Sequence, residues 1–389
     1  MRTVLSSALA LLLATSIAFS QTTTPPSASP ATKGMIVPLA LDIPVPPTAF
    51  RGDGLWHLCY EIHITNLSST AWIVQNIQAK SDSGAALLTV EGKTLDTVLF
   101  HPARPRDAKP APAADIAPGE AVVAYMWIDL AKDSATPARL QHQLSVKKAD
   151  GGLVLEADVP PVKVLTGLPE IMSPLRGKNW LATNGPSNTS QHRRAMIVVD
   201  ATPHISQRYA IDWVQIGPDN KTYHGDSKDN RNYHCFGLEA HAIADATVVE
   251  VKDGIPENVP NEKPIVPITF ETVAGNHVNL DLGGGVYAMY AHLQPGSIRV
   301  KVGDKVTTGQ VLGLVGNTGN SSEAHLHFQL MNANSPLGSE GLPYTFPGYQ
   351  FDGKVSGETP ETVKVDRPAT PEKRHGELPM EDELVDFDQ

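Results

Sequence analysis

His325-Leu-His-Phe-Gln-Leu330 is a short apolar stretch that carries two histidines, and the earlier stretch Val286-Tyr-Ala-Met-Tyr-Ala-His292 ends in a third. Both have the length and composition of β-strands, and the glycines at 283–285 predict a tight turn before the earlier one. Side chains on a strand alternate between its faces, so His325 and His327 should share a face. Two imidazoles on one face can divide a task, because one can bind a metal ion while the other transfers a proton.

The rest of the chain also predicts strands rather than long helices. Its 389 residues include 31 glycines and 32 prolines, which favour turns. Regularly spaced short strands over residues 35–164 predict an immunoglobulin-like β-sandwich. A connector over residues 165–188 leads to a second β-domain over residues 189–350, which contains the histidine stretches. We therefore expect a mainly β protein, with an N-terminal β-sandwich followed by an antiparallel β-sheet domain.

The two ends of the chain differ from these domains in composition. Residues 1–20 combine a basic start, an apolar run and a small-residue cleavage pattern, which predicts a signal peptide. An uncleaved membrane anchor is the rival interpretation. Residues 21–34 are rich in Pro, Ser and Thr and predict a linker. Residues 351–389 predict an acidic, disordered tail, because residues 358–389 hold ten acidic and four basic side chains, a net charge of −6 out of −11.

These features predict where the protein acts and what it does not bind. Export by a signal peptide implies a secreted or periplasmic protein with no stable membrane insertion after cleavage. The chain outside its acidic tail is close to neutral, which argues against nucleic-acid binding. In an oxidising compartment Cys59 and Cys235 could form a disulfide. They lie in different predicted domains, so the pairing stays open.

Several motifs around the histidine stretches carry a family resemblance. They are Tyr290-Ala-His-Leu-Gln-Pro-Gly-Ser297, Val302-Gly-Asp-Lys-Val306, Gly316-Asn-Thr-Gly319 and His325-Leu-His-Phe328. Their combination over residues 191–331 resembles the lysostaphin-type (LytM-like) zinc metallopeptidases, which are peptidoglycan endopeptidases. The resemblance implies that the second domain is an antiparallel β-sheet metallopeptidase domain.

The resemblance also implies roles for individual residues. The second histidine of His-x-His corresponds to a zinc ligand, here His327, and the acid that closes the upstream motif corresponds to another, here Asp212. His325 and His292 correspond to the catalytic histidines. Zn²⁺ suits such ligands, because it binds imidazole and carboxylate and keeps one position for water. It lowers the pKa of that water and polarises a carbonyl, while free imidazoles nearby can accept a proton and stabilise an oxyanion.

One position departs from the family pattern. The usual first motif is His-x-x-x-Asp, but Arg208 stands four residues before Asp212, and an arginine stays protonated and cannot be a ligand. We expect His192 to be the third ligand, because a hairpin through residues 200–206 would place it opposite Asp212. Arg208 could bind a substrate carboxylate or form a structural ion pair. The alternatives to His192 are a two-residue or metal-free site, or another histidine from the set His204, His224 and His234.

The functional expectation is therefore an exported zinc metalloendopeptidase that hydrolyses peptide cross-links of bacterial peptidoglycan, with peptidoglycan peptide as its partner. The alternative is a catalytically degenerate domain of the same family that binds cell-wall peptide or activates another wall hydrolase. Arg208 is the feature that favours this alternative. A third interpretation makes the β-sandwich the working part, as an adhesion or docking module. The sequence predicts neither the oligomeric state nor which cross-link is cut.

Overall fold

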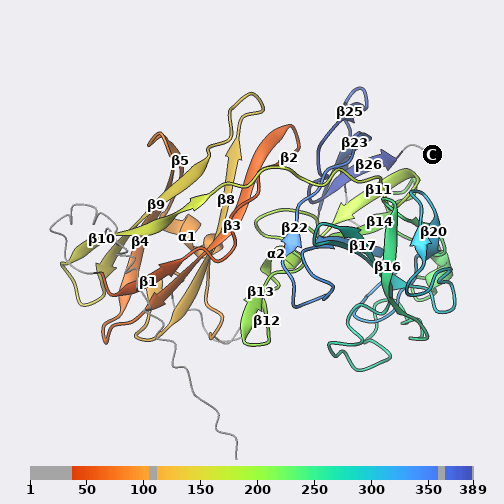
Figure 1. Ribbon diagram of the computed structural model, residues 1–389, viewed down its shortest axis with the longest axis horizontal. Helices are drawn as coiled ribbons and strands as arrows, with labels where there is room; N and C mark the ends of the chain where they lie inside the picture. Colours follow the sequence, from red (N-terminus) through yellow and green to blue (C-terminus); the bar gives the residue numbers. More distant parts are fainter. Residues whose placement is uncertain (1–36, 105–111, 358–363, 388–389) are drawn as a thin grey trace, which may run out of the picture. The chain divides into compact units, whose positions relative to one another are not determined.

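The computed structural model describes residues 37–104, 112–357 and 364–387, which fold mostly as strands (Figure 1). Pro38–Gln389 forms one compact unit. The strands of each sheet pair in antiparallel fashion, so the prediction of a mainly β, antiparallel fold is confirmed. The expected signal peptide and linker, residues 1–20 and 21–34, lie outside the described residues. Among the described residues, no helix has both the length and the apolar character that a membrane span needs.

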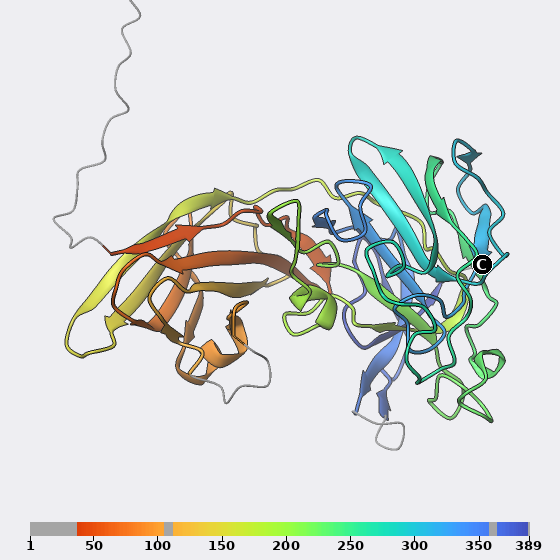
Figure 2. The same ribbon diagram turned by 90° about the horizontal axis from the view of Figure 1, so that it is seen from below.

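The N-terminal part is a sandwich of two sheets, each with five strands in the described chain (Figure 2). The first has the order β1-β3-β8-β6, with β2 paired to β3. Its strands are β1 (Leu39–Asp42), β2 (Phe50–Gly52), β3 (Leu55–Asn66), β6 (Leu99–Phe100) and β8 (Ala121–Leu130). The second has the order β10-β9-β4-β5, with β7 paired to β4. Its strands are β4 (Trp72–Ser81), β5 (Ala86–Glu91), β7 (Asp115–Ile116), β9 (Arg139–Lys148) and β10 (Val154–Lys163), and η1 (Gly92–Thr94) and α1 (Leu95–Val98) follow β5.

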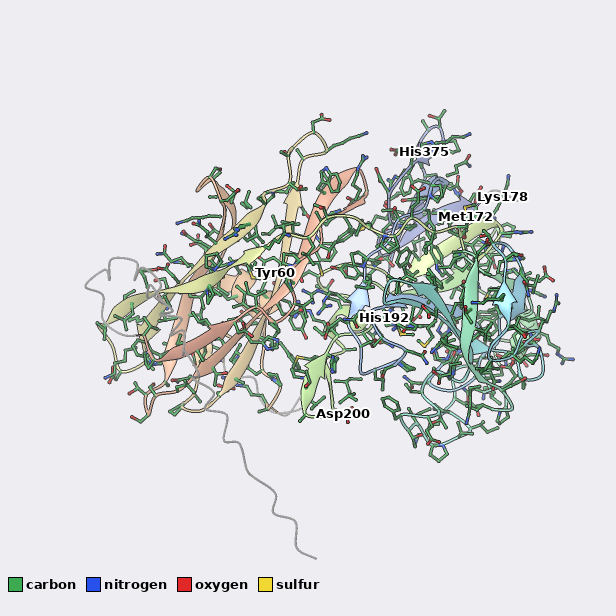
Figure 3. The ribbon with its side chains drawn as sticks, viewed as in Figure 1. Tyr60, Met172, Lys178, His192, Asp200 and His375 are labelled. Atoms are coloured by element: carbon green, nitrogen blue, oxygen red, sulfur yellow. The ribbon has the colours of Figure 1, made fainter. Side chains whose placement is uncertain are left out.

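The sandwich closes on alternating apolar side chains. Leu58, Tyr60 and Ile62 of β3 are all buried, as the period of two along a strand requires for one face. Tyr60, labelled in Figure 3, donates its hydroxyl hydrogen to His142 Nε2 on the opposite sheet, at 2.6 Å. Burial lowers the pKa of His142 to about 4, so the ring is neutral and can accept this bond. The two layers are thus joined by packing and by a hydrogen bond between two buried polar side chains.

The C-terminal part is built on one large sheet of twelve strands in the described chain. Its order is β19-β16-β17-β18-β21-β14-β11-β26-β23-β24, with β22 paired to β21 and β25 to β23. The strands are β11 (Gly177–Thr183), β14 (Ile211–Gln215), β16 (Ala246–Lys252), β17 (Asn276–Gly283), β18 (Val286–Leu293), β19 (Lys305–Val306), β21 (Leu326–Met331), β22 (Gly341–Leu342), β23 (Tyr349–Ser356), β24 (Lys364–Asp366), β25 (Glu372–Arg374) and β26 (Glu383–Phe387).

Short elements flank the large sheet. Two separate two-stranded antiparallel sheets lie outside it in the described chain, one of β12 (Ile197–Val199) with β13 (Thr202–His204) and one of β15 (Glu239–His241) with β20 (Val311–Leu314). The helical turns are α2 (Gln191–Arg194) and η2 (Asn230–Asn232). Cys59 and Cys235 are buried free thiols, so the disulfide left open by the sequence is not formed.

The prediction of a disordered acidic tail over residues 351–389 is wrong for the described part. β26 lies between β11 and β23 in the large sheet, as the blue strands beside β11 in Figure 1 show. Its Leu384 and Val385 are fully buried, and Glu383 receives a hydrogen bond from Arg374 at 2.6 Å. The net charge of the segment could not predict this strand, because a buried, paired carboxylate contributes the same formal charge as a solvated one.

The predicted connector, residues 165–188, is also part of the folded domain. It contains β11, which pairs with β14 on one side and with β26 on the other. Trp180 of β11 is fully buried, and its indole nitrogen donates to the Arg176 carbonyl at 3.0 Å. The glycines and prolines around this strand suggested a linker, but the strand itself lies near the middle of the sheet.

Candidate metal centre and active site

Three adjacent strands bring the site together. In the register of β14 with β21, Asp212 lies directly opposite His327. In the register of β18 with β21, Ala291 lies opposite the same histidine. Directly opposed residues on antiparallel strands are close enough for their side chains to interact. His327 therefore stands in the middle of the site, with a carboxylate on one flank and the end of β18 on the other.

His192 completes a group of three potential metal ligands. One ligand atom from each of His192, Asp212 and His327 lies within 4.8 Å of the others. His327 Nδ1 is 2.8 Å from Asp212 Oδ1, and His192 Nε2 is 3.3 Å from Asp212 Oδ2. These are the residues that we expected, and the structure brings them together. They offer two imidazole nitrogens and a carboxylate, the donor types that zinc prefers.

The hydrogen bonds of the two rings fix which nitrogen faces Asp212. His192 Nδ1 donates to the Asn184 carbonyl at 3.0 Å, which leaves a lone pair on Nε2. His327 Nε2 lies 2.8 Å from Gln329 Oε1, an acceptor, which leaves a lone pair on Nδ1. Asn184 Nδ2 also donates to Asp212 Oδ2 at 2.9 Å. Each potential ligand is therefore oriented by a partner behind it, as metal-binding histidines in proteins usually are.

His292 and His325 lie beside this group without belonging to it. Their ring centroids are 4.7 Å apart, and His325 Nε2 is 3.4 Å from Asp212 Oδ1. His292 Nδ1 donates to the Thr318 carbonyl at 2.7 Å, and His325 Nδ1 donates to the Glu323 carbonyl at 2.9 Å. In both rings Nε2 is not used by a backbone carbonyl and can exchange a proton with a bound substrate.

The backbone at His292 is unusual. Its φ is +64°, in the left-handed region, which is uncommon for a residue other than glycine. Asn276 pairs with Leu293 and Val278 with Tyr290, so two residues of β18 oppose only His277 of β17. This is a β-bulge, a feature that redirects a side chain and occurs often beside active sites. The bulge explains how His292 reaches His325 although it follows Ala291 directly.

The charges in the group determine its protonation. Burial alone would raise the pKa of Asp212, but His192 and His325 hold it well below the ordinary value. Burial, His325 and His327 place the pKa of His292 well below the usual range, so this ring is neutral. For His325, burial would lower the pKa, but Asp212 raises it above the usual value. Burial keeps the pKa of His327 low although Asp212 opposes the effect.

The group opens into a cleft of about 420 Å³. The cleft walls combine apolar and uncharged polar side chains with the histidines, Asp212 and Glu262. Its lining residues include Asn184, Gln207, Val273, Met289, Asn320, Ser321, Pro336 and Leu337. Ser321 Oγ also lies 3.2 Å from His325 Nδ1, so one wall of the cleft touches a histidine directly. A cleft of this kind can hold an extended chain against the reactive groups.

The hairpin that we predicted between His192 and Asp212 is not formed. β12 pairs with β13 through a turn at Asp200 and Ala201, and His192 lies on α2 rather than on a strand opposite Asp212. Figure 3 labels His192 on this short helix. The sequence contained no signal for the correct route, because α2 is positioned by contacts with distant segments.

Arg208 lies outside the group of ligands. It precedes β14 instead of sharing its face, and its Nη2 is 2.8 Å from both Glu61 Oε2 and Glu340 Oε2. Its side chain is 3% exposed. The interpretation of Arg208 as a structural ion pair therefore holds, and the one in which it binds a substrate carboxylate is wrong.

The other candidate histidines lie elsewhere. His204 Nδ1 is 3.1 Å from Glu340 Oε1, and His224 and His234 pack against each other with ring centroids 5.5 Å apart. Sequence reasoning missed Asn184 and Gln329, which orient the two ligand rings. Gln329 had a weak signal, since it follows His327 by two residues and so shares its strand face. Asn184 had none.

A buried carboxylate and two imidazoles in one group, with two further imidazoles at a cleft, are the side chains that a metal-dependent hydrolase needs. Residues 236–338 match Peptidase family M23. The match confirms, for this segment, the similarity to lysostaphin-type peptidases that its motifs predict. The matched range includes His292, His325 and His327 but neither His192 nor Asp212.

Relatives can be compared over part of the chain. Peptidoglycan DD-endopeptidase ShyA of Vibrio cholerae is 36% identical over 149 residues, which are 36% of this chain and 32% of ShyA. Lysostaphin of Staphylococcus simulans is 37% identical over 92 residues, 23% of this chain and 18% of lysostaphin. The solved catalytic domain of lysostaphin from that organism has 22% identity and a TM-score of 0.24, and the match covers 42% of this chain and 88% of that domain. The chain thus spans about a third or less of these curated relatives.

Proposed function

We propose that the chain is an exported zinc metalloendopeptidase that hydrolyses peptide cross-links of bacterial peptidoglycan. The observation that carries the proposal is the convergence of His192 Nε2, an Asp212 oxygen and His327 Nδ1 within 4.8 Å, beside two more imidazoles. The names of two relatives support this substrate class: peptidoglycan DD-endopeptidase ShyA, and a glycyl-glycine endopeptidase of Staphylococcus capitis that is 47% identical over 58 residues. The sequence of residues 1–20 supports export.

The donor set fits zinc. His192, Asp212 and His327 supply three ligands in a buried setting, and three protein ligands leave a coordination position for water. Zinc bound there would lower the pKa of a water molecule and polarise the carbonyl of the scissile peptide. Asn184 and Gln329 hold the ligand rings in the tautomers that this requires.

We assign proton transfer and stabilisation of the oxyanion to His292 and His325. A substrate peptide in the cleft lies against both rings, whose Nε2 atoms are not used by the backbone carbonyls that hold Nδ1. One Nε2 can accept a proton from the attacking water, and the other, when protonated, can donate to the oxyanion and then to the leaving amine. The bulge at His292 brings these two rings to 4.7 Å from each other.

Arg208 no longer favours a degenerate site. Its ion pairs with Glu61 and Glu340 give it a structural partner, and His192 supplies a donor next to Asp212. We therefore place the binding-only alternative second, and the sandwich-only alternative third.

The test uses the mature protein, residues 21–389, with zinc content measured by mass spectrometry and hydrolysis measured on purified peptidoglycan. We expect about one zinc per chain, release of cross-linked peptides as their separated products, loss of release with a chelator and recovery with added zinc. A zinc-loaded protein that binds peptidoglycan but cuts none of its peptides would support the binding module instead. The chemical structure of the products identifies the bond that is cut.

A further inference from the structure

The ligand His192 sits on an element that cannot hold itself in place. α2 has only four residues, Gln191–Arg194, and an isolated helical turn of this length is not stable in water. No strand of the large sheet pairs with it in the described residues. The position of His192 must therefore come from side-chain contacts with other segments.

Some of those contacts come from the preceding loop, where the carbonyls of Asn184 and Asn188 accept from His192 and Arg194. The others come from the β-sandwich. Arg193, next to His192, is fully buried and donates to the Glu61 carboxylate and to the Tyr60 carbonyl, the latter at 2.9 Å. Arg194 donates to the Thr97 carbonyl at 2.7 Å. Both Glu61 and Tyr60 belong to β3 of the sandwich, so the helix is tied to a rigid strand.

A tyrosine ring receives both arginines of α2. The guanidinium carbon of Arg193 is 4.7 Å and that of Arg194 is 4.2 Å from the ring centroid of Tyr125 on β8. The same strand accepts a hydrogen bond from Asn188 Nδ2 at the Tyr125 carbonyl, 3.1 Å away. Stacking of guanidinium groups on an aromatic ring is favourable and fixes their direction. The sandwich thus sets the rotation of α2 as well as its distance.

Glu61 connects α2 to the segment before Asp212. Its second oxygen accepts from Arg208 Nη2 at 2.8 Å, while Arg208 Nε is 3.3 Å from the first oxygen. One buried carboxylate thereby joins two guanidinium groups, one adjacent to His192 and one four residues before Asp212. A charge that ties two ligand-bearing segments to a third element controls the spacing between them, because a buried guanidinium must keep its partner.

We infer that the β-sandwich is a positioning domain for the metal centre, in which Glu61 and Tyr125 hold α2 so that His192 Nε2 faces Asp212. This inference rests on the proposed zinc site. In this role the sandwich contributes to the metal centre by positioning His192. It also explains how a ligand can lie outside the His-x-x-x-Asp pattern, in which Arg208 stands at the first position. Glu61 and Tyr125 are positioning residues, since neither touches the metal-ligand group itself.

The test is the zinc affinity of Glu61→Gln, measured by competition with a chromophoric chelator. We expect a loss of about ten- to hundredfold, the usual result when a residue that orients a metal ligand is replaced. The matched control is Glu120→Gln, which removes the same charge from another partly buried cluster in the sandwich, with His101 and Arg104. The control should leave zinc affinity unchanged.

A double-mutant cycle separates positioning from general destabilisation. In a His192→Ala background, Glu61→Gln should cause no further loss of zinc affinity, because the ligand on which it acts is gone. The absorption spectrum of the Co²⁺-substituted Glu61→Gln protein should shift toward that of His192→Ala. Tyr125→Leu, which keeps an apolar side chain under the arginines, should weaken zinc binding in the same way and serves if Glu61→Gln does not fold.

Two results would overturn the inference alone. One is a folded Glu61→Gln or Tyr125→Leu protein with wild-type zinc affinity, and the other is an equal further loss in the His192→Ala background. A wild-type protein that binds no zinc, or whose zinc affinity is unchanged by His192→Ala, would overturn the proposed site and this inference together.

Discussion

The two halves of the candidate site are positioned by different means. His292, His325 and His327 lie on or beside β18 and β21, within the range that matches family M23, and backbone pairing sets their spacing. His192 lies outside that range, on a four-residue turn held by side chains of the sandwich. A candidate ligand can therefore lie on an element too short to be stable alone, if another domain supplies the rigidity that a strand would give.

The largest expected effect tests whether both halves bind one metal ion. We expect His327→Ala and Asp212→Ala each to abolish zinc retention, because each removes one of three ligands at a site that favours four-coordination. Zinc content after dialysis measures the effect. His277→Ala is the control, since His277 is buried on the same sheet but bonds to the Gly275 carbonyl and Glu250. Full zinc occupancy in either ligand variant would remove that residue from the site.

The second prediction separates proton transfer from metal binding within the strand-borne half. His292→Ala and His325→Ala should keep zinc and lose hydrolysis by roughly a hundredfold or more. Their Nδ1 atoms are used by backbone carbonyls, so the loss concerns Nε2 at the cleft. Peptide release from peptidoglycan and zinc content should be measured on the same samples. If either variant lost its zinc, the histidine that it replaces would be a metal ligand instead.

The third prediction concerns the arginine that replaces the family ligand. Arg208→Met should keep about one zinc per chain and lower the free energy of unfolding by about 2 kcal/mol. This lies below the roughly 3–5 kcal/mol for a fully broken buried pair, because Glu61 keeps Arg193 as a partner. Urea unfolding with and without zinc measures this change in the free energy of unfolding. A variant that folds normally but loses its zinc would show that metal binding needs Arg208, either directly or through its contact with Glu61.

The smallest of these effects is expected at Gln329. Gln329→Leu removes the acceptor 2.8 Å from His327 Nε2 and should weaken zinc binding by about tenfold, because the ring is no longer held in one tautomer. Chelator competition is sensitive enough to resolve this change. Unaltered affinity would mean that β21 alone orients the ring.

The same comparison explains what the sequence could predict. His325 and His327 are separated by one residue, and His292 ends a strand of the same hairpin region, so the period of two and the turn signals sufficed to group them. Asp212 followed from its motif. The mainly β class followed from short apolar segments between turns.

The failures concern contacts between distant segments. His192 reaches Asp212 through α2 rather than through the predicted hairpin, because Arg193 binds Glu61, which is far away in sequence. The acids around the C-terminal strand β26 predict disordered chain, although Glu383 pairs with Arg374. No local sequence pattern predicts such partners, because a charged segment has the same sequence whether its side chains are solvated or paired with distant residues.

The central claim is that one zinc ion is held jointly by the two halves of the site. Crystals of the zinc-loaded mature protein, measured above and below the zinc absorption edge, test it most directly. The account predicts one anomalous peak at about 2.0–2.2 Å from His192 Nε2, an Asp212 oxygen and His327 Nδ1, with Arg208 bound to Glu61. A peak held without His192, or a protein that takes up no zinc at this position, would contradict it.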